Sequence, residues 1–130
     1  MNEWVSIHNH TMFSLLDGCG RITDFVAYAK QCGFKSLAIS DHGTCAGYLD
    51  FQALCLEHNI KPIFGVECYI ATDMNIKGVT DEEKDTLSPE EVKFRNKNYH
   101  LILLAKNNEG LKTIYKIMTA ANQVGYHRRP

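Results

Sequence analysis

Apolar side chains recur along this chain at two spacings, one typical of helices and one typical of strands. Apolar residues three or four positions apart predict helices over residues 22–32, 48–58 and 111–121. Short apolar or alternating runs predict strands over residues 5–7, 36–40, 61–70 and 101–105. Gly33 follows the first helix, at a position where glycine commonly ends a helix.

The alternation of strands and helices predicts an α/β fold in which mainly parallel strands are joined by crossover helices. Residues 101–105 are apolar at every position, which is typical of a strand buried on both faces. Polar residues gather directly after the first two strands, and the functional residues of β/α barrels lie at that end. We therefore expect a β/α arrangement with its chemistry at one end.

Residues 72–98 break this rhythm, because they are rich in charge and poor in large apolar side chains. Within them, Ser88 can cap a helix, Pro89 suits the first helical position and Glu91 can complete a capping box. The segment is predicted to be an exposed, mobile excursion from the domain at 1–130, with one short helix.

Composition narrows the class of protein. Of the 130 residues, 45% are hydrophobic and 22% charged, as expected for one folded domain or a piece of a larger one. The net charge of -1 gives no electrostatic footprint for nucleic acid, so any DNA contact must be local. No membrane span or signal peptide is evident, so a cytoplasmic protein without a membrane partner is expected. Five cysteines without a CxxC pair argue against a disulfide framework or a zinc ribbon.

Three histidines and an aspartate in the first part of the chain are candidate ligands. His8 and His10 are two apart at a strand end, so both imidazoles can face one metal ion. The alternative is one exposed and one core histidine. Asp17 precedes Gly18, and because Asp-Gly favours turns, Asp17 by itself is better explained as a turn residue. His42 comes directly after a buried strand, which suits a site at a barrel mouth.

Two further candidates lie in the later strands. Glu67 stands in an apolar strand, where a carboxylate needs a metal or a salt-bridge partner. His100 begins a strand instead of following one, so by itself it is predicted to be a capping or surface residue. Cys19 and Cys45 lie in the same loops as Asp17 and His42, but the harder donors there are the better candidates.

Taken together, nitrogen and oxygen donors at successive strand ends suit zinc, manganese or iron. Several such metals held close together serve phosphate-ester hydrolysis, since they activate water and neutralise phosphoryl oxygens.

These segments resemble the PHP (polymerase and histidinol phosphatase) family. The likeness is strongest to the PHP domains at the N-terminus of bacterial DNA polymerase III alpha subunits. It covers almost all of the chain outside residues 72–98, and its motifs are Ile7-His8-Asn9-His10, Leu15-Leu16-Asp17-Gly18, Ser40-Asp41-His42-Gly43, Gly65-Val66-Glu67 and Tyr99-His100-Leu101.

The resemblance implies a distorted β/α barrel with a trinuclear site for divalent metals, zinc or manganese. His8 and His10 would hold one metal with Glu67, and Glu67 would bridge to a second metal that also takes His100. Asp17 and His42 would share the third metal. Glu67 and His10 are the residues that it places in the reaction.

The family's later ligand motifs and the polymerase domains have no counterpart in this sequence. The expectation is therefore the N-terminal part of a PHP domain, inactive alone, whose partners are the remainder of a polymerase III alpha chain and, through it, DNA. Three functions remain open: a phosphoesterase with 3′-5′ proofreading potential, a structural module that docks a proofreading exonuclease subunit, and a free-standing phosphatase of the histidinol-phosphatase type.

Overall fold

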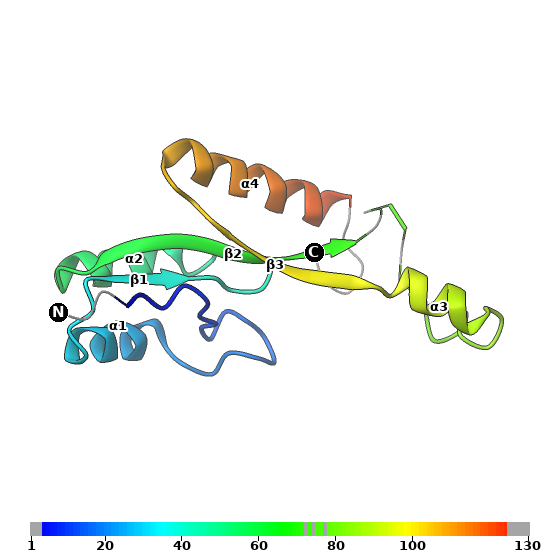
Figure 1. Cartoon of the computed structure of the whole chain (residues 1–130), viewed down its shortest axis with the longest axis horizontal. Coiled ribbons are helices and arrows are strands. Elements are labelled where there is room, and N and C mark those ends of the chain that lie inside the picture. Colours follow the sequence, from blue (N-terminus) through cyan, green and yellow to red (C-terminus); the bar gives the residue numbers. More distant parts are fainter. Residues whose placement is uncertain (1–3, 72, 74, 77, 125–130) are drawn as a thin grey trace.

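Four helices and three strands make up the described part of the chain, which in this computed structural model comprises residues 4–71, 73, 75–76 and 78–124 (Figure 1). In chain order they are α1 (Ile22–Gln31), β1 (Ser36–Ile39), α2 (Tyr48–Glu57), β2 (Lys61–Ala71), α3 (Pro89–Arg95), β3 (Asn98–Leu104) and α4 (Asn108–Gln123). The α/β class is confirmed, and the predicted helices at 22–32, 48–58 and 111–121 are present. No described helix is long and apolar enough to cross a membrane.

The strands form one sheet in the order β1-β2-β3. β1 and β2 are parallel and are joined through α2, as the crossover pattern predicts. β3 runs antiparallel to β2. The prediction that residues 101–105 are buried on both faces is wrong, because β3 is exposed or half-buried along its whole length. Among the described residues β2 is its only neighbouring strand, so β3 lies at the sheet edge.

The predicted strand at residues 5–7 is not a regular strand, although its backbone runs beside β1. Ala38 N donates to Ser6 O at 3.1 Å, and Ser40 N donates to Asn9 O at 3.0 Å. The two bonds are two residues apart on the β1 side, from 38 to 40, but three residues apart on the N-terminal segment, from 6 to 9. The extra residue interrupts the ladder as a β-bulge does. The Asn9 side chain restores one lost contact, since its Nδ2 donates to Ala38 O at 2.9 Å.

Two apolar clusters hold the elements together. The first joins α1, β1 and α2 and includes the fully buried Val26, Ile39 and Phe51. The second lies between β2 and α4 and contains Val66, Cys68, Ile114 and Met118. Figure 1 shows α4 above the sheet and α1 below it. The packing therefore fixes β2 between two layers of helices.

The charged excursion has more structure than its composition predicts. Ser88 caps α3 as expected, with its Oγ accepting from Glu91 N at 3.2 Å. Arg95 pairs with Glu83 at 3.3 Å, and Asn96 Oδ1 accepts from the backbone N of the buried Val79 at 2.9 Å. α3 itself buries no side chain and projects from the end of the sheet (Figure 1). Mobility of this segment stays a prediction.

Candidate metal centre

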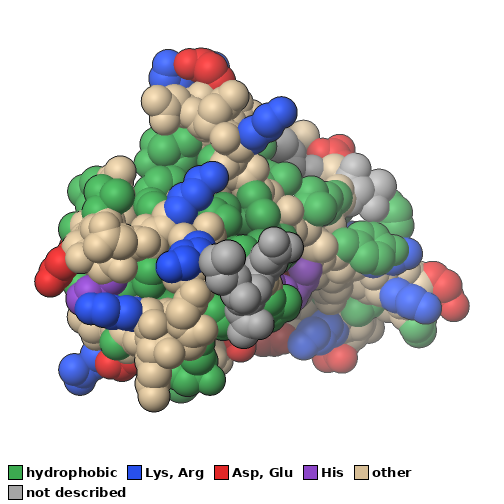
Figure 2. Space-filling model, turned by 60° about the vertical axis from the view of Figure 1, so that its left-hand side comes forward, with side chains coloured by type: hydrophobic (Ala, Val, Ile, Leu, Met, Phe, Trp, Pro, Cys, Tyr) green, Lys and Arg blue, Asp and Glu red, His purple; other side chains and the backbone are tan. Residues whose placement is uncertain are grey.

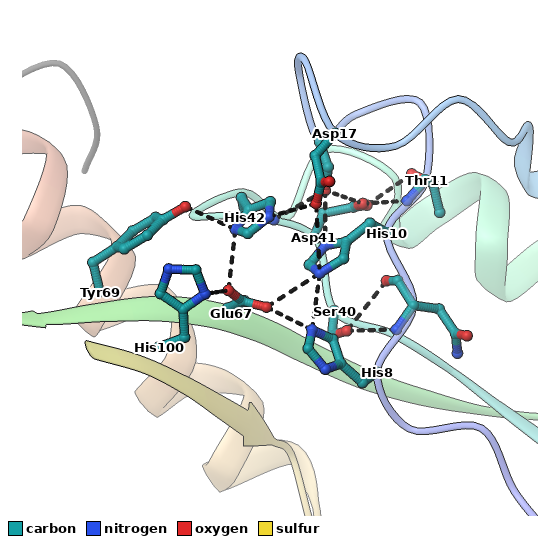
Figure 3. Close-up of polar contacts among 12 residues, drawn as sticks. His8, His10, Thr11, Asp17, Ser40, Asp41, His42, Glu67, Tyr69 and His100 are labelled. Carbon is teal, nitrogen blue, oxygen red and sulfur yellow. Dashed lines mark hydrogen bonds and ion pairs between the residues drawn. The ribbon is translucent and has the colours of Figure 1, made fainter. Parts of the chain in front are cut away.

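All six candidate ligands line one cavity of about 820 Å³ (Figure 3). They come from five parts of the chain: the segment beside β1, the loop before α1, the loop after β1, and strands β2 and β3. The six are His8, His10, Asp17, His42, Glu67 and His100.

His100 reaches the cavity because β3 is antiparallel. In the strand pairing His100 stands opposite Tyr69, near the carboxyl end of β2. The beginning of β3 therefore lies at the same end of the sheet as the ends of β1 and β2. The residues alone predict a surface position, and the His100 side chain is indeed 53% exposed, but it also contacts Glu67.

Glu67 is the centre of the cluster. Its side chain is only 1% exposed, and its two oxygens face different partners. Oε2 lies 2.6 Å from His8 Nε2 and 3.1 Å from His10 Nε2. Oε1 lies 3.3 Å from His42 Nδ1 and in close contact with His100 Nδ1. No lysine or arginine of the described chain pairs with Glu67. If Glu67 were a salt-bridge residue and not a metal ligand, its partners would therefore be histidines.

Backbone hydrogen bonds hold the loop after β1 against Glu67. Glu67 N donates to Asp41 O at 3.1 Å, and Gly43 N donates to Glu67 O at 2.9 Å. Gly43 has a φ of 57°, in the left-handed region that favours glycine. This local geometry places His42 over the carboxylate.

His42 links two polar groups across the cavity (Figure 3). Its Nε2 lies 2.8 Å from Asp17 Oδ2, and its Nδ1 lies 3.0 Å from the Tyr69 hydroxyl. Both ring nitrogens of His42 therefore face a carboxylate, because Nδ1 also lies 3.3 Å from Glu67 Oε1. The hydrogen bond to His42 lowers the pKa of Asp17, so this carboxylate stays ionised.

Asp41, which was not among the predicted site residues, supports the loop that carries His10 and Asp17. It is 1% exposed and accepts hydrogen bonds from Thr11 N at 2.6 Å, Thr11 Oγ1 at 2.8 Å and Ser14 Oγ at 2.7 Å. The signal that could have found it resembles the one used for Glu67, a carboxylate beside apolar strand residues; Asp41 follows the apolar strand β1, whereas Glu67 lies within β2. These hydrogen bonds attach the loop that carries His10 and Asp17 to the end of β1.

Ser14 fixes the tautomer of His10. Its hydroxyl donates to Asp41 Oδ1 and its oxygen accepts from His42 N at 3.1 Å. His10 Nδ1, 3.2 Å from the same oxygen, can then only donate, so Nε2 carries a lone pair directed at Glu67 and His8. Burial, with a contribution from His42, lowers the pKa of His10 and keeps the imidazole neutral. Neutral imidazole is the form that binds metals.

The remaining candidates stand apart from the cluster. Cys45 packs against both apolar clusters, and burial raises the pKa of its thiol, which disfavours the thiolate that a metal requires. Cys19 is exposed. His58 contacts Lys30 on the surface.

The donors fit divalent metal ions. Two groups of three ligand atoms each lie within 4.8 Å of one another: His8, His10 and Glu67, and His10, Asp17 and His42. Glu67 Oε1 is buried and makes no well-formed hydrogen bond within the described chain, although two imidazoles lie beside it. A buried carboxylate oxygen in this state is costly, and a cation between the imidazoles would satisfy it.

Comparison with known proteins matches the chain to one family. Residues 6–130 match the family profile described as the PHP domain. The chain is 38% identical over 128 residues to the DNA polymerase III subunit alpha of Aquifex aeolicus (strain VF5), covering 98% of this chain and 10% of that protein. The alpha subunit of Borreliella burgdorferi (strain ATCC 35210 / DSM 4680 / CIP 102532 / B31) is 35% identical over 129 residues, covering 99% and 10%.

A similar fold occurs in a solved structure, that of a Bifidobacterium adolescentis ATCC 15703 protein described as a metal-dependent phosphoesterase. The TM-score is 0.54 and the sequence identity 21%, with 92% of this chain and 34% of that chain covered.

Proposed function

This chain belongs to the PHP domain family, and from that premise we propose that it is a metal-dependent phosphoesterase domain of the kind carried by bacterial DNA polymerase III alpha subunits. The similarity to those subunits extends over nearly the whole chain, which spans about a tenth of their length. We propose DNA as the substrate, with hydrolysis of the phosphodiester at a 3′ end as a proofreading reaction. In that setting its partners are the remainder of an alpha chain and the replicating DNA.

The observation that carries the proposal is the charge of the cavity. Glu67 and Asp17 line it together with four imidazoles, and no lysine or arginine is among its described lining residues. Without cations, this set of donors would repel a phosphate ester. With divalent metals bound, the same donors become a site for phosphoryl oxygens. The mixture of imidazole and carboxylate favours zinc or manganese.

Bound metals would supply an activated water and neutralise the charge that develops on the phosphoryl group. This chain's own residues hold and orient that chemistry. Glu67 directs one oxygen at His8 and His10 and the other at His42 and His100, as a bridging ligand requires. Ser14 keeps His10 Nε2 free to bind.

A docking role is the second candidate, because the chain exposes many large apolar side chains (Figure 2). Phe94, Tyr99 and Leu101 lie on α3 and β3 and are 49%, 57% and 42% exposed. Apolar surface of this kind marks protein interfaces, and a proofreading exonuclease subunit is the partner that we propose for it. The histidinol-phosphatase alternative has no comparable support, since the polymerase subunits match along nearly the whole chain.

The test is hydrolysis of single-stranded DNA labelled at its 3′ end, measured with the protein at its natural length. We expect release of the terminal nucleotide in manganese or zinc, none after chelation, and loss of release in His10→Ala. His58→Ala is the matched control, since His58 lies outside the cavity. Metal binding without hydrolysis would assign the domain to docking.

A further inference from the structure

Two exposed leucines stand at the rim of the metal-site cavity. Leu15 and Leu16 both line it and are 85% and 107% exposed. They directly precede Asp17, whose carboxylate contacts His42. A strongly apolar surface therefore adjoins the most polar part of the molecule.

Backbone hydrogen bonds and a close contact restrict the conformation of the loop that carries these leucines. Met12 N donates to Gly20 O at 2.8 Å, and Gly18 N donates to Ser14 O at 2.9 Å. A Cβ on Gly18 would lie 2.0 Å from Thr11 O, so only glycine permits this closure. The buried hydrogen bond from Ser14 to Asp41 anchors the loop to the sheet. The backbone that carries Leu15 and Leu16 is therefore held in place by these contacts.

Leu16 has a conformation that folding alone does not favour. Its φ is 68°, in the left-handed region that leucine rarely adopts, whereas glycine or asparagine would adopt it readily. Its fully exposed side chain gains no packing in return. Strained residues of this kind cluster at functional sites, where a ligand contact gives the reason for them.

We propose that Leu15 and Leu16 form a subsite for the base of the nucleotide whose phosphate the metal centre holds. A nucleotide ester joins a charged phosphoryl group to a flat base whose faces are apolar. The cavity offers metal-binding donors for the first and leucines for the second. The inference rests on the proposed function and names the part of the substrate that the rim contacts. It makes the two leucines specificity residues, outside the hydrolytic step.

Binding of two oligonucleotides tests the subsite. Fluorescence anisotropy would compare the manganese-loaded chain on a short thymidine strand and on the same strand with an abasic 3′ residue, both protected by a terminal phosphorothioate. We expect about tenfold tighter binding of the strand with the base, roughly the effect of burying part of one leucine. Leu15→Gln should bring the two affinities close together. Leu56 on α2 is also an exposed leucine, at 61%, but does not line the cavity, so Leu56→Gln should leave the preference intact.

Leu16→Gly separates a ligand role from a structural one. Relief of the positive φ should raise the melting temperature, while the preference for the base falls several-fold. Asn59→Gly, at the other described non-glycine residue with positive φ, should leave that preference unchanged.

Equal affinity of the wild-type chain for both strands, or no binding of either, overturns the subsite. So does a fall in melting temperature of Leu16→Gly with the preference retained. Calorimetric titration with manganese distinguishes the two levels of failure. A chain that takes no manganese overturns the proposed function and the subsite together, whereas a chain that takes manganese but ignores the base overturns the subsite alone.

Discussion

At the scale of single residues, the site depends on carboxylates placed where burial forces them to find partners. Glu67 could be singled out from the sequence because it interrupts an apolar strand, and Asp41 could have been found in the same way. The role of Ser14 could not, since nothing in its neighbours indicates that one hydroxyl would contact Asp41, His42 and His10 together. Such a network depends on the folded positions of three segments.

Ser14→Ala tests that network. The change removes a donor from the buried Asp41 and the oxygen that fixes the His10 tautomer, so we expect metal affinity to fall by about 10-fold or more. Stability should drop by about 1–3 kcal/mol, because the buried Asp41 loses one of its donors and His42 N loses its acceptor. Titration calorimetry with zinc and urea unfolding measure the two effects.

Ser88→Ala is the control for this change, because Ser88 caps α3 and is not among the residues that line the cavity. It should cost about 1 kcal/mol without changing metal affinity. Equal metal affinity of Ser14→Ala and the wild type would remove Ser14 from the account.

At the scale of elements, spacing predicted the helices and the parallel pair β1 and β2, but not the direction of β3. An apolar run such as residues 101–105 indicates a strand without indicating its direction or what covers it. The direction is decided by the long connection through α3, which returns the chain to the carboxyl end of β2, where Asn98 stands opposite Ala71. That single reversal brings His100 to the site, and for this reason only the family resemblance placed it there beforehand.

Gly65→Ala tests the contact between β2 and β3. A Cβ at this position would lie 2.5 Å from a Leu104 side-chain carbon and 2.7 Å from Leu103 O, so β3 must move away. We expect a loss of about 1–3 kcal/mol in the free energy of unfolding, measured with urea. Hydrogen exchange of the β3 amides should become faster in the same variant.

The matched change is Gly110→Ala in α4, where the nearest atom to a new Cβ is 3.5 Å away. Alanine favours the helix there, so stability should stay level or rise slightly. If Gly65→Ala is as stable as Gly110→Ala, the close pairing of β2 with β3 is not as described.

At the scale of the whole molecule, the chain combines a well-packed pair of clusters with a broad exposed apolar surface (Figure 2). Within the described part of the chain β3 lies at the sheet edge, and Tyr99, Leu101 and Leu104 on it are 57%, 42% and 38% exposed. Exposed apolar edge strands pair readily with other chains. The alpha-subunit relatives are about ten times longer, and a partner surface for β3 is part of the docking function proposed above.

The purified chain is therefore expected to self-associate as its concentration rises. Leu101→Lys should reduce this association, because a charge on an edge strand opposes pairing. Leu56→Lys, on α2, should have a smaller effect. Sedimentation velocity measures the association, and a chain that stays monomeric at high concentration would show that the β3 edge is not adhesive.

The most direct test of the metal centre is the metal content and melting temperature of Glu67→Gln, with Glu57→Gln on α2 as the control. Glutamine keeps the shape of Glu67 but loses the charge that faces both groups of donors. The account predicts that Glu67→Gln loses most of its bound zinc or manganese, that the control retains it, and that the metal-free proteins melt at similar temperatures. Full metal occupancy in Glu67→Gln, with only a lower melting temperature, would contradict it.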